Sequence, residues 1–94
     1  MHGKPYDWSV IKNEKLKAER DISFEEMITA IEDGGLLDTV DTPHPQKYGG
    51  QRMFVVDFCA YVYLVPFVED DEKIFLKTIF PSRKATKKFL KSNL

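Results

Sequence analysis

The chain has 94 residues, of which 43% are apolar and 13% aromatic, and its formal net charge is −1. This length and composition predict one small domain spanning residues 1–94, with a core that needs no disulfide. The single cysteine excludes an internal disulfide bridge. No apolar run reaches the length of a membrane span, and the polar start M-H-G-K is not a signal peptide. The sequence contains no motif typical of metal sites or nucleotide-binding loops. We therefore expect a cytoplasmic protein that uses no metal, cofactor or membrane, with Cys59 as a buried, inert thiol.

The first predicted helix lies within Y-D-W-S-V-I-K-N-E-K-L-K-A-E-R, after a short extended piece. Asp7 or Ser9 is the expected N-cap, because either side chain accepts a hydrogen bond from a helix N–H group. The apolar face is thin and consists of Trp8, Ile11 and Ala18. Such a helix depends on tertiary contacts for its stability.

The second predicted helix, at about 23–33, carries the strongest local signal. Ser23 and Glu26 form an S-x-x-E capping box, and Ile22 and Met27 occupy the two positions of a hydrophobic staple. Apolar residues then follow the helical period, at Phe24, Met27, Ile28 and Ile31. The G-G pair that follows supplies a left-handed stop.

After these glycines the apolar residues alternate, which predicts four strands. The first contains Leu36, Leu37 and Val40, and the others are M-F-V-V-D-F, Y-V-Y-L-V-P-F-V and I-F-L-K-T-I-F. The segment E-D-D-E-K joins the last two as a hairpin loop. Because Pro66 has no backbone N–H, it marks an edge or a bulge. We expect an exposed sheet edge near Pro66 and Phe67 that could dock a partner. The alternative is that these residues belong to the core.

A final helix, R-K-A-T-K-K-F-L-K, follows the N-cap residue Ser82. Ala85 and Phe89 are expected to face the core. The complete order of elements predicts an α+β fold, in which N-terminal helices pack on a four-stranded, twisted antiparallel sheet that is followed by a C-terminal helix.

The charges are distributed unevenly along the chain. Residues 73–94 carry seven basic residues and no acidic one, whereas residues 1–72 carry seven basic and fifteen acidic residues. Such an asymmetry points to a polyanionic or acidic partner. The alternative is a solvated helix face with no binding role.

Arg83 is the first candidate for chemistry. It opens the last helix, where unpaired backbone N–H groups and the helix dipole favour an anion, so its guanidinium suits a phosphate group. The lysines behind it, Lys84, Lys87, Lys88 and Lys91, could follow a phosphate backbone. The alternative is that these side chains only keep the helix soluble.

His44, Tyr48 and Arg52 fall within nine positions at the entry to the sheet. Groups of these types can move protons and stabilise charge during phosphodiester cleavage. Each also has a structural explanation, as a turn residue or a packing residue. Lys12 on the first helix is a further candidate and, taken alone, is a solvated lysine.

Several motifs, taken in order, resemble the BrnT-like toxins of bacterial type II toxin–antitoxin systems, a branch of the RelE-like ribonuclease fold. They are Y-D-W-S-V-I-K-N-E-K-L, I-S-F-E-E, D-T-P-H-P, Q-R-M-F-V-V and K-T-I-F-P-S-R-K-A-T-K-K-F. The resemblance runs from Tyr6 to Phe89. It implies a metal-independent endoribonuclease that cleaves mRNA through attack of the ribose 2′-OH on the adjacent phosphate. By position, it implies catalytic roles for Lys12, His44, Arg52 and Arg83. For an RNA substrate, we expect Tyr48, Lys84, Lys87, Lys88 and Lys91 to be the contact residues.

The resemblance also implies partners. These are the RNA substrate and a cognate antitoxin of the ribbon-helix-helix type, with operator DNA reached only through the antitoxin. At one point the chain departs from the family pattern, because Arg20 stands where the family commonly has a histidine. Arginine does not act as a general base at neutral pH. The alternative function is therefore a non-enzymatic module whose basic helix binds an acidic protein segment.

Overall fold

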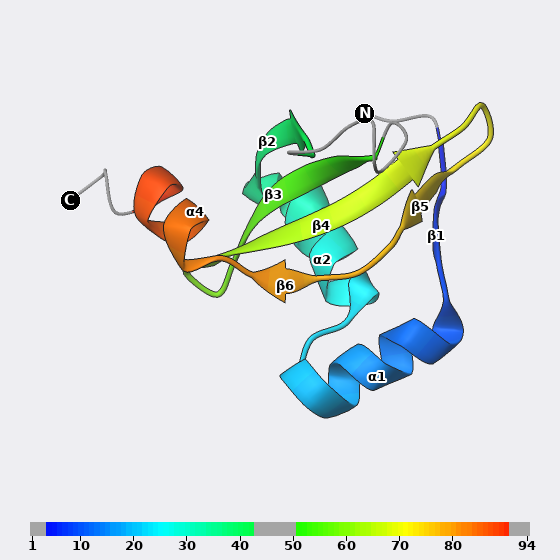
Figure 1. Cartoon of the computed structure of the whole chain (residues 1–94), viewed down its shortest axis with the longest axis horizontal. Helices are drawn as coiled ribbons and strands as arrows, with labels where there is room; N and C mark the ends of the chain where they lie inside the picture. The colour runs from blue at the N-terminus through cyan, green and yellow to red at the C-terminus, as the bar shows by residue number, and fades with distance from the viewer. Residues whose placement is uncertain (1–3, 43–50, 91–94) are drawn as a thin grey trace.

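The computed structural model describes residues 4–42 and 51–90. These residues form a compact α+β globule, as the order of elements predicts (Figure 1). The elements in chain order are β1 (Tyr6–Trp8), α1 (Val10–Arg20), α2 (Phe24–Ala30), the π-helical turn η1 (Ile31–Gly35), β2 (Leu36–Asp41), β3 (Arg52–Phe58), β4 (Tyr61–Glu69), β5 (Ile74–Leu76), β6 (Phe80–Pro81) and α4 (Arg83–Phe89).

The sheet has six strands in these residues, so the prediction of a four-stranded antiparallel sheet is wrong in two respects. The strand order is β1-β5-β4-β3-β2, and β6 pairs with β4 beyond the end of β5. The predicted extended piece before α1 is a true strand, β1, and it runs parallel to β5. The fourth predicted strand, I-F-L-K-T-I-F, is divided into β5 and β6.

One face of the sheet carries the main hydrophobic core. Helix α2 covers this face and passes behind β3 and β4 in the view of Figure 1. Alternate residues of the strands meet the buried side chains of α1 and α2 there, and the fully buried members include Phe24, Met27, Val56, Val65 and Ile79. Alternation along β3 and β4 therefore leaves a second set of side chains on the opposite face.

The capping prediction for α2 is confirmed. The Ser23 hydroxyl accepts a hydrogen bond from the Glu26 N–H, and the Glu26 carboxylate accepts one from the Ser23 N–H. The helix widens into η1 and ends at Gly34, whose φ of 95° is left-handed. Gly35 lies so close to β3 that an added Cβ would stand 2.7 Å from the Asp57 carbonyl oxygen.

The predicted apolar face of α1 is wrong for Ile11 and Ala18, whereas Trp8, which precedes the helix, packs against the core as expected. Ser9 is the N-cap, but Ile11 is 82% exposed, Ala18 is also exposed, and the buried residues of the helix are Asn13 and Leu16. Asn13 is buried because both ends of its amide are bonded to α2. It accepts a hydrogen bond from the Phe24 N–H at 2.8 Å and donates one to the Glu25 carboxylate at 2.7 Å.

Pro66 explains why the last hairpin strand is divided. In the register of the sheet, Phe67 faces Leu76 and Leu64 faces Phe80, so two residues of β4 oppose three residues, 77–79, on the other side. This is a β-bulge with one extra residue. The Pro66 carbonyl oxygen accepts a hydrogen bond from the Lys77 N–H at 2.8 Å, so the side of Pro66 that lacks an N–H faces the bulge.

The prediction that Pro66 marks an edge or a bulge is confirmed for the bulge, whereas the expected exposed edge at Pro66 and Phe67 is wrong. Strand β4 is central in the sheet, and both residues are buried. The extra residue also shifts the alternation. Ile79 points into the main core, and Phe80 moves to the opposite face, where it shares a pair with Leu64.

Helix α4 is held against the start of β4 by hydrogen bonds. The Thr86 hydroxyl accepts one from the Val62 N–H at 2.9 Å, and the Ser82 N–H donates one to the Val62 carbonyl oxygen at 3.0 Å. Ser82 is the N-cap as predicted, and its hydroxyl accepts from the Ala85 N–H. Ala85 and Phe89 are half-buried on the side that faces the sheet.

The turn between β3 and β4 carries backbone strain. Cys59 and Ala60 both have left-handed φ angles, 54° and 62°, as in a type I′ turn, where glycine and asparagine are preferred. Cys59 is exposed at this turn, so the expectation of a buried thiol is wrong. Its apolar sequence neighbours belong to the two strands, and the turn itself projects from the sheet.

We predict that Ala60→Gly stabilises the protein by about 1 kcal/mol, because glycine adopts the left-handed region without the steric cost that alanine has there. The matched control is Ala18→Gly on the exposed face of α1, which is expected to destabilise by about 1 kcal/mol. Urea unfolding followed by circular dichroism measures both changes. Destabilisation by Ala60→Gly would contradict the assignment of strain to this turn.

An ion pair connects β1 to Lys73, the residue that precedes β5. The Lys73 ammonium lies 3.0 Å from the Asp7 carboxylate, and this hydrogen bond, together with one from the Trp8 N–H, lowers the pKa of Asp7. A carboxylate whose pKa is lowered by folding stabilises the native state above its ordinary pKa, and this contribution is lost as the pH falls through the lowered value.

Replacing Asp7 with Asn is therefore expected to lower the melting temperature near neutral pH. The difference from the parent protein should close as the pH is lowered below the ordinary aspartate pKa of about 3.9. Asp71→Asn, in the exposed β4–β5 loop, is the control and should show little difference at either pH. Thermal melts across this pH range test the expectation, and a constant difference would contradict it.

Candidate functional site

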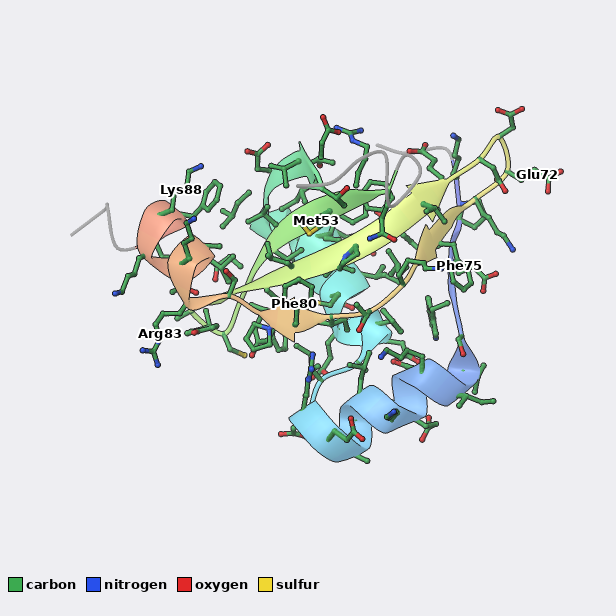
Figure 2. The ribbon with its side chains drawn as sticks, in the orientation of Figure 1. Met53, Glu72, Phe75, Phe80, Arg83 and Lys88 are labelled. Atoms are coloured by element: carbon green, nitrogen blue, oxygen red, sulfur yellow. The ribbon has the colours of Figure 1, made fainter. Side chains whose placement is uncertain are left out.

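A groove lies on the face of the sheet that α1 and α2 do not cover. Its volume is about 460 Å³. Figure 2 shows Met53 and Phe80 on the side of the sheet opposite α2, one on each side of β4. The residues that line the groove are Thr42, Gln51, Met53, Pro66, Lys77, Thr78 and Phe80.

The bulge opposite Pro66 builds one wall of this groove. In a regular ladder without a bulge, Phe80 would face the main core like Leu76, because the two are four positions apart in an alternating strand. The bulge instead brings Lys77, Thr78 and Phe80 to the groove together. Pro66 forms part of its apolar floor.

Thr42 supplies an unsatisfied polar group at the opposite wall. The residue follows the end of β2 and is only 5% exposed, yet its Oγ1 has no hydrogen-bond partner among the described residues. A buried hydroxyl without a partner costs free energy, and native proteins rarely leave one unused. One residue that lines the groove therefore carries a buried hydroxyl without a partner in the described part of the chain.

Lys77 is the only charged residue that lines the groove within the described part of the chain. It is exposed, and its ammonium lies 5.7 Å from the centre of the Phe75 ring. Lys73 approaches the same ring at 5.9 Å. This arrangement places positive charge and an aromatic surface beside the groove.

Helix α4 presents its basic residues to solvent. Arg83, Lys84, Lys87 and Lys88 are all exposed. Across residues 4–42 and 51–90, no acidic side chain forms an ion pair with Arg83, Lys84 or Lys87. The Lys88 ammonium lies 5.5 Å from the Phe89 ring centre. In Figure 2, Arg83 and Lys88 point away from the sheet.

The anion site predicted at the first turn of this helix is weaker than expected. The helix has only seven residues, and its Ala85 N–H is already bonded to Ser82. The attraction of α4 for an anion therefore depends mainly on its side-chain charges, and less on its backbone.

The structure does not bring the three described catalytic candidates together. Arg83 lies at the end of the sheet where α4 contacts Val62, whereas Arg52 lies opposite Phe67. These positions on β4 are about 17 Å apart along the strand. Arg52 lies 3.4 Å from Asp41 in an exposed ion pair, and Lys12 lies on the first turn of α1, on the other side of the sheet.

His44, Tyr48 and Lys91 lie outside the described residues. The residues on either side of segment 43–50, Thr42 and Gln51, both line the groove. Arg20 has a structural role. Its guanidinium donates a hydrogen bond to the Ile79 carbonyl oxygen at 2.6 Å and so ties the end of α1 to the bulge.

Sequence reasoning missed the groove itself. Thr42, Lys77 and Phe80 attract no attention as residue types, and only Pro66 carried a signal in the sequence, as a bulge. Among the described residues, no group of three His, Cys, Asp or Glu side chains could hold a metal ion. No helix in the same part of the chain is both long and apolar enough to cross a membrane.

Thr42→Val is expected to stabilise the protein by about 1 kcal/mol, because valine keeps the shape and removes the unsatisfied hydroxyl. Thr42→Ser, which keeps the hydroxyl and loses a methyl group, should destabilise it. Urea unfolding distinguishes the two. A loss of stability in Thr42→Val would show that the hydroxyl has a partner in the native protein.

Comparisons of the chain with known protein families, with curated proteins and with solved structures find no significant match. The support for a function therefore comes from the groove, the α4 cations and the sequence motifs.

Proposed function

We propose that the chain binds RNA across the sheet face that carries the groove and α4, as the toxin of a type II toxin–antitoxin system with a RelE/BrnT-like fold. The observation that carries this proposal is the basic face of α4. Arg83, Lys84 and Lys87 are exposed and form no ion pair with the described residues. Clustered cations without intramolecular partners are typical of a surface that contacts phosphates.

The reaction in this proposal is metal-independent cleavage of mRNA. The ribose 2′-oxygen forms a bond to the adjacent phosphorus, the bond from phosphorus to the 5′-oxygen breaks, and a 2′,3′-cyclic phosphate and a 5′-hydroxyl result. A base takes the 2′-OH proton, and an acid gives a proton to the leaving 5′-oxygen. His44 and Tyr48 are the candidates for these transfers, and Arg83 stabilises the charge that develops on phosphate.

The separation of the candidate residues narrows this assignment. Lys12 and Arg52 lie far from Arg83, so among the described residues the proposal centres on Arg83, while His44 and Tyr48 stay candidates from the sequence. An acidic region of a ribbon-helix-helix antitoxin would cover the same cations, and operator DNA would be reached only through that partner.

A second function is favoured by Arg20. Its guanidinium is engaged with the Ile79 carbonyl oxygen, so the position where the family commonly has a histidine is used here to hold α1. A chain that has lost this histidine fits a non-enzymatic module that binds an acidic protein segment through α4. Such a module would act only through its partner.

Induction of the protein alone in a bacterial host should arrest growth and deplete mRNA. Arg83→Ala and His44→Ala should each relieve the arrest, with purified protein losing about 10²-fold or more in cleavage rate. The control is Lys15→Ala, which removes one exposed charge from α1 and should leave the arrest unchanged. Normal growth with soluble parent protein, together with intact RNA in vitro, would favour the binding module.

A further inference from the structure

We infer that the groove is a nucleotide subsite, which holds one unit of an RNA strand with its base on the apolar floor and its phosphate at Lys77. This inference rests on the proposed function for the source of the nucleotide, but the site itself is defined by its own residues. Three observations support it: the size and floor of the groove, the Thr42 hydroxyl, and the position of the cations.

The floor suits a flat, unsaturated ring. Met53, Pro66 and Phe80 lie side by side on one face of the sheet and contribute thioether, pyrrolidine and phenyl surfaces. A volume of about 460 Å³ falls within the usual range for small-ligand pockets, which are largely apolar with few polar groups. Sulfur and aromatic groups pack well against the faces of nucleobases.

The Thr42 hydroxyl adds a requirement for hydrogen bonding. It is buried, lines the groove and lacks a partner in the described part of the chain. A purely apolar ligand would leave it unsatisfied, whereas a base edge offers both donors and acceptors. Gln51 and Thr78 add further polar groups at the rim.

Lys77 determines which charge the ligand needs and how the ligand is oriented in the groove. Thr42 follows β2 and Lys77 follows β5, so three strand spacings, or about 14 Å, separate their backbones. A ligand that contacts both is therefore elongated, with a neutral end at Thr42 and an anionic end toward Lys77. Only Pro81 and Ser82 separate Phe80 from Arg83 in the chain, so the groove and α4 adjoin along the sequence.

Nucleotide binding to the full chain tests the subsite directly. The probes are AMP, CMP, GMP and UMP, with the four nucleosides and inorganic phosphate as partial ligands. The methyl signal of Met53, followed by NMR with labelled methionine, is expected to shift with at least one nucleotide. The corresponding nucleoside and phosphate alone should bind at least about fivefold more weakly, because each lacks half of the contacts.

Substitutions identify the groups responsible. Thr42→Val should weaken nucleotide binding about fivefold through the lost hydrogen bond, while Thr42→Ser should retain it. Lys77→Gln should weaken binding by about tenfold, because a charge-assisted contact is lost. Lys15→Gln on α1 is the matched control and should have no effect. Because Thr42→Val is expected to stabilise the fold, its effect on binding cannot arise from unfolding.

The outcomes separate this inference from the proposed function. Nucleotide shifts at Met53 that respond to Thr42 and Lys77 support the subsite, and a parallel weakening of a short oligoribonucleotide identifies RNA as the source. The same shifts without oligoribonucleotide binding support a site for free nucleotides and count against the RNA function. Oligoribonucleotide binding that depends on Arg83, with no response of Met53 and no effect of Thr42→Val or Lys77→Gln, overturns the subsite and leaves the proposed function standing. A shift with phosphate alone that equals the nucleotide shift would also overturn it.

Discussion

The absence of a backbone N–H at Pro66 is the constraint on which the arrangement of this protein depends. A central strand cannot keep its ladder continuous at a proline, and here the neighbouring segment responds with one extra residue. That residue inverts the alternation beyond it, so that Ile79 enters the core and Phe80 leaves it. At the same irregularity, the Ile79 carbonyl oxygen accepts a hydrogen bond from the Arg20 guanidinium, which connects the end of α1 to the bulge.

The two faces of the sheet are consequently covered in different ways. The face under α2 is closed by packed apolar side chains and by the polar link through Asn13, which fixes α1 relative to α2. The other face is covered at one end by α4, which is held by the Thr86 hydroxyl and is not deeply buried. A short helix that is anchored by a few hydrogen bonds can present all of its cations to solvent, because packing requires only its Ala85 and Phe89 side.

Local features of the fold were predictable from the sequence, and long-range ones were not. The capping box at Ser23 and Glu26 and the cap at Ser82 are decided within four residues, so the pattern identified them correctly. The parallel pairing of Tyr6 with Ile74 joins residues far apart in the chain, and no local period encodes it. The burial of Leu16 instead of Ile11 depends on the direction from which α2 approaches α1.

The candidate site shows the same division. Exposure of the α4 cations follows from helical geometry and was expected. The grouping of Thr42, Lys77 and Phe80 arises from the bulge and from three neighbouring strands, which a linear pattern cannot show. The separation of Arg52 from Arg83 is also a property of the sheet. Arg52 pairs with Phe67 at one end of β4, whereas α4 is bonded to Val62 at the other end.

The acidic β4–β5 loop and the basic helix α4 lie at opposite ends of the long axis of the molecule (Figures 1 and 2). Glu69, Asp70, Asp71 and Glu72 cluster at one end, and the α4 cations lie at the other. The molecule therefore has an electric dipole along this axis, although its net charge is only −1. In the field of a polyanion the molecule experiences a torque before it makes contact, and it arrives with α4 leading and the acidic loop trailing. In such a field, α4 would meet the polyanion first although the net charge is not positive, and this effect declines as salt screens the field.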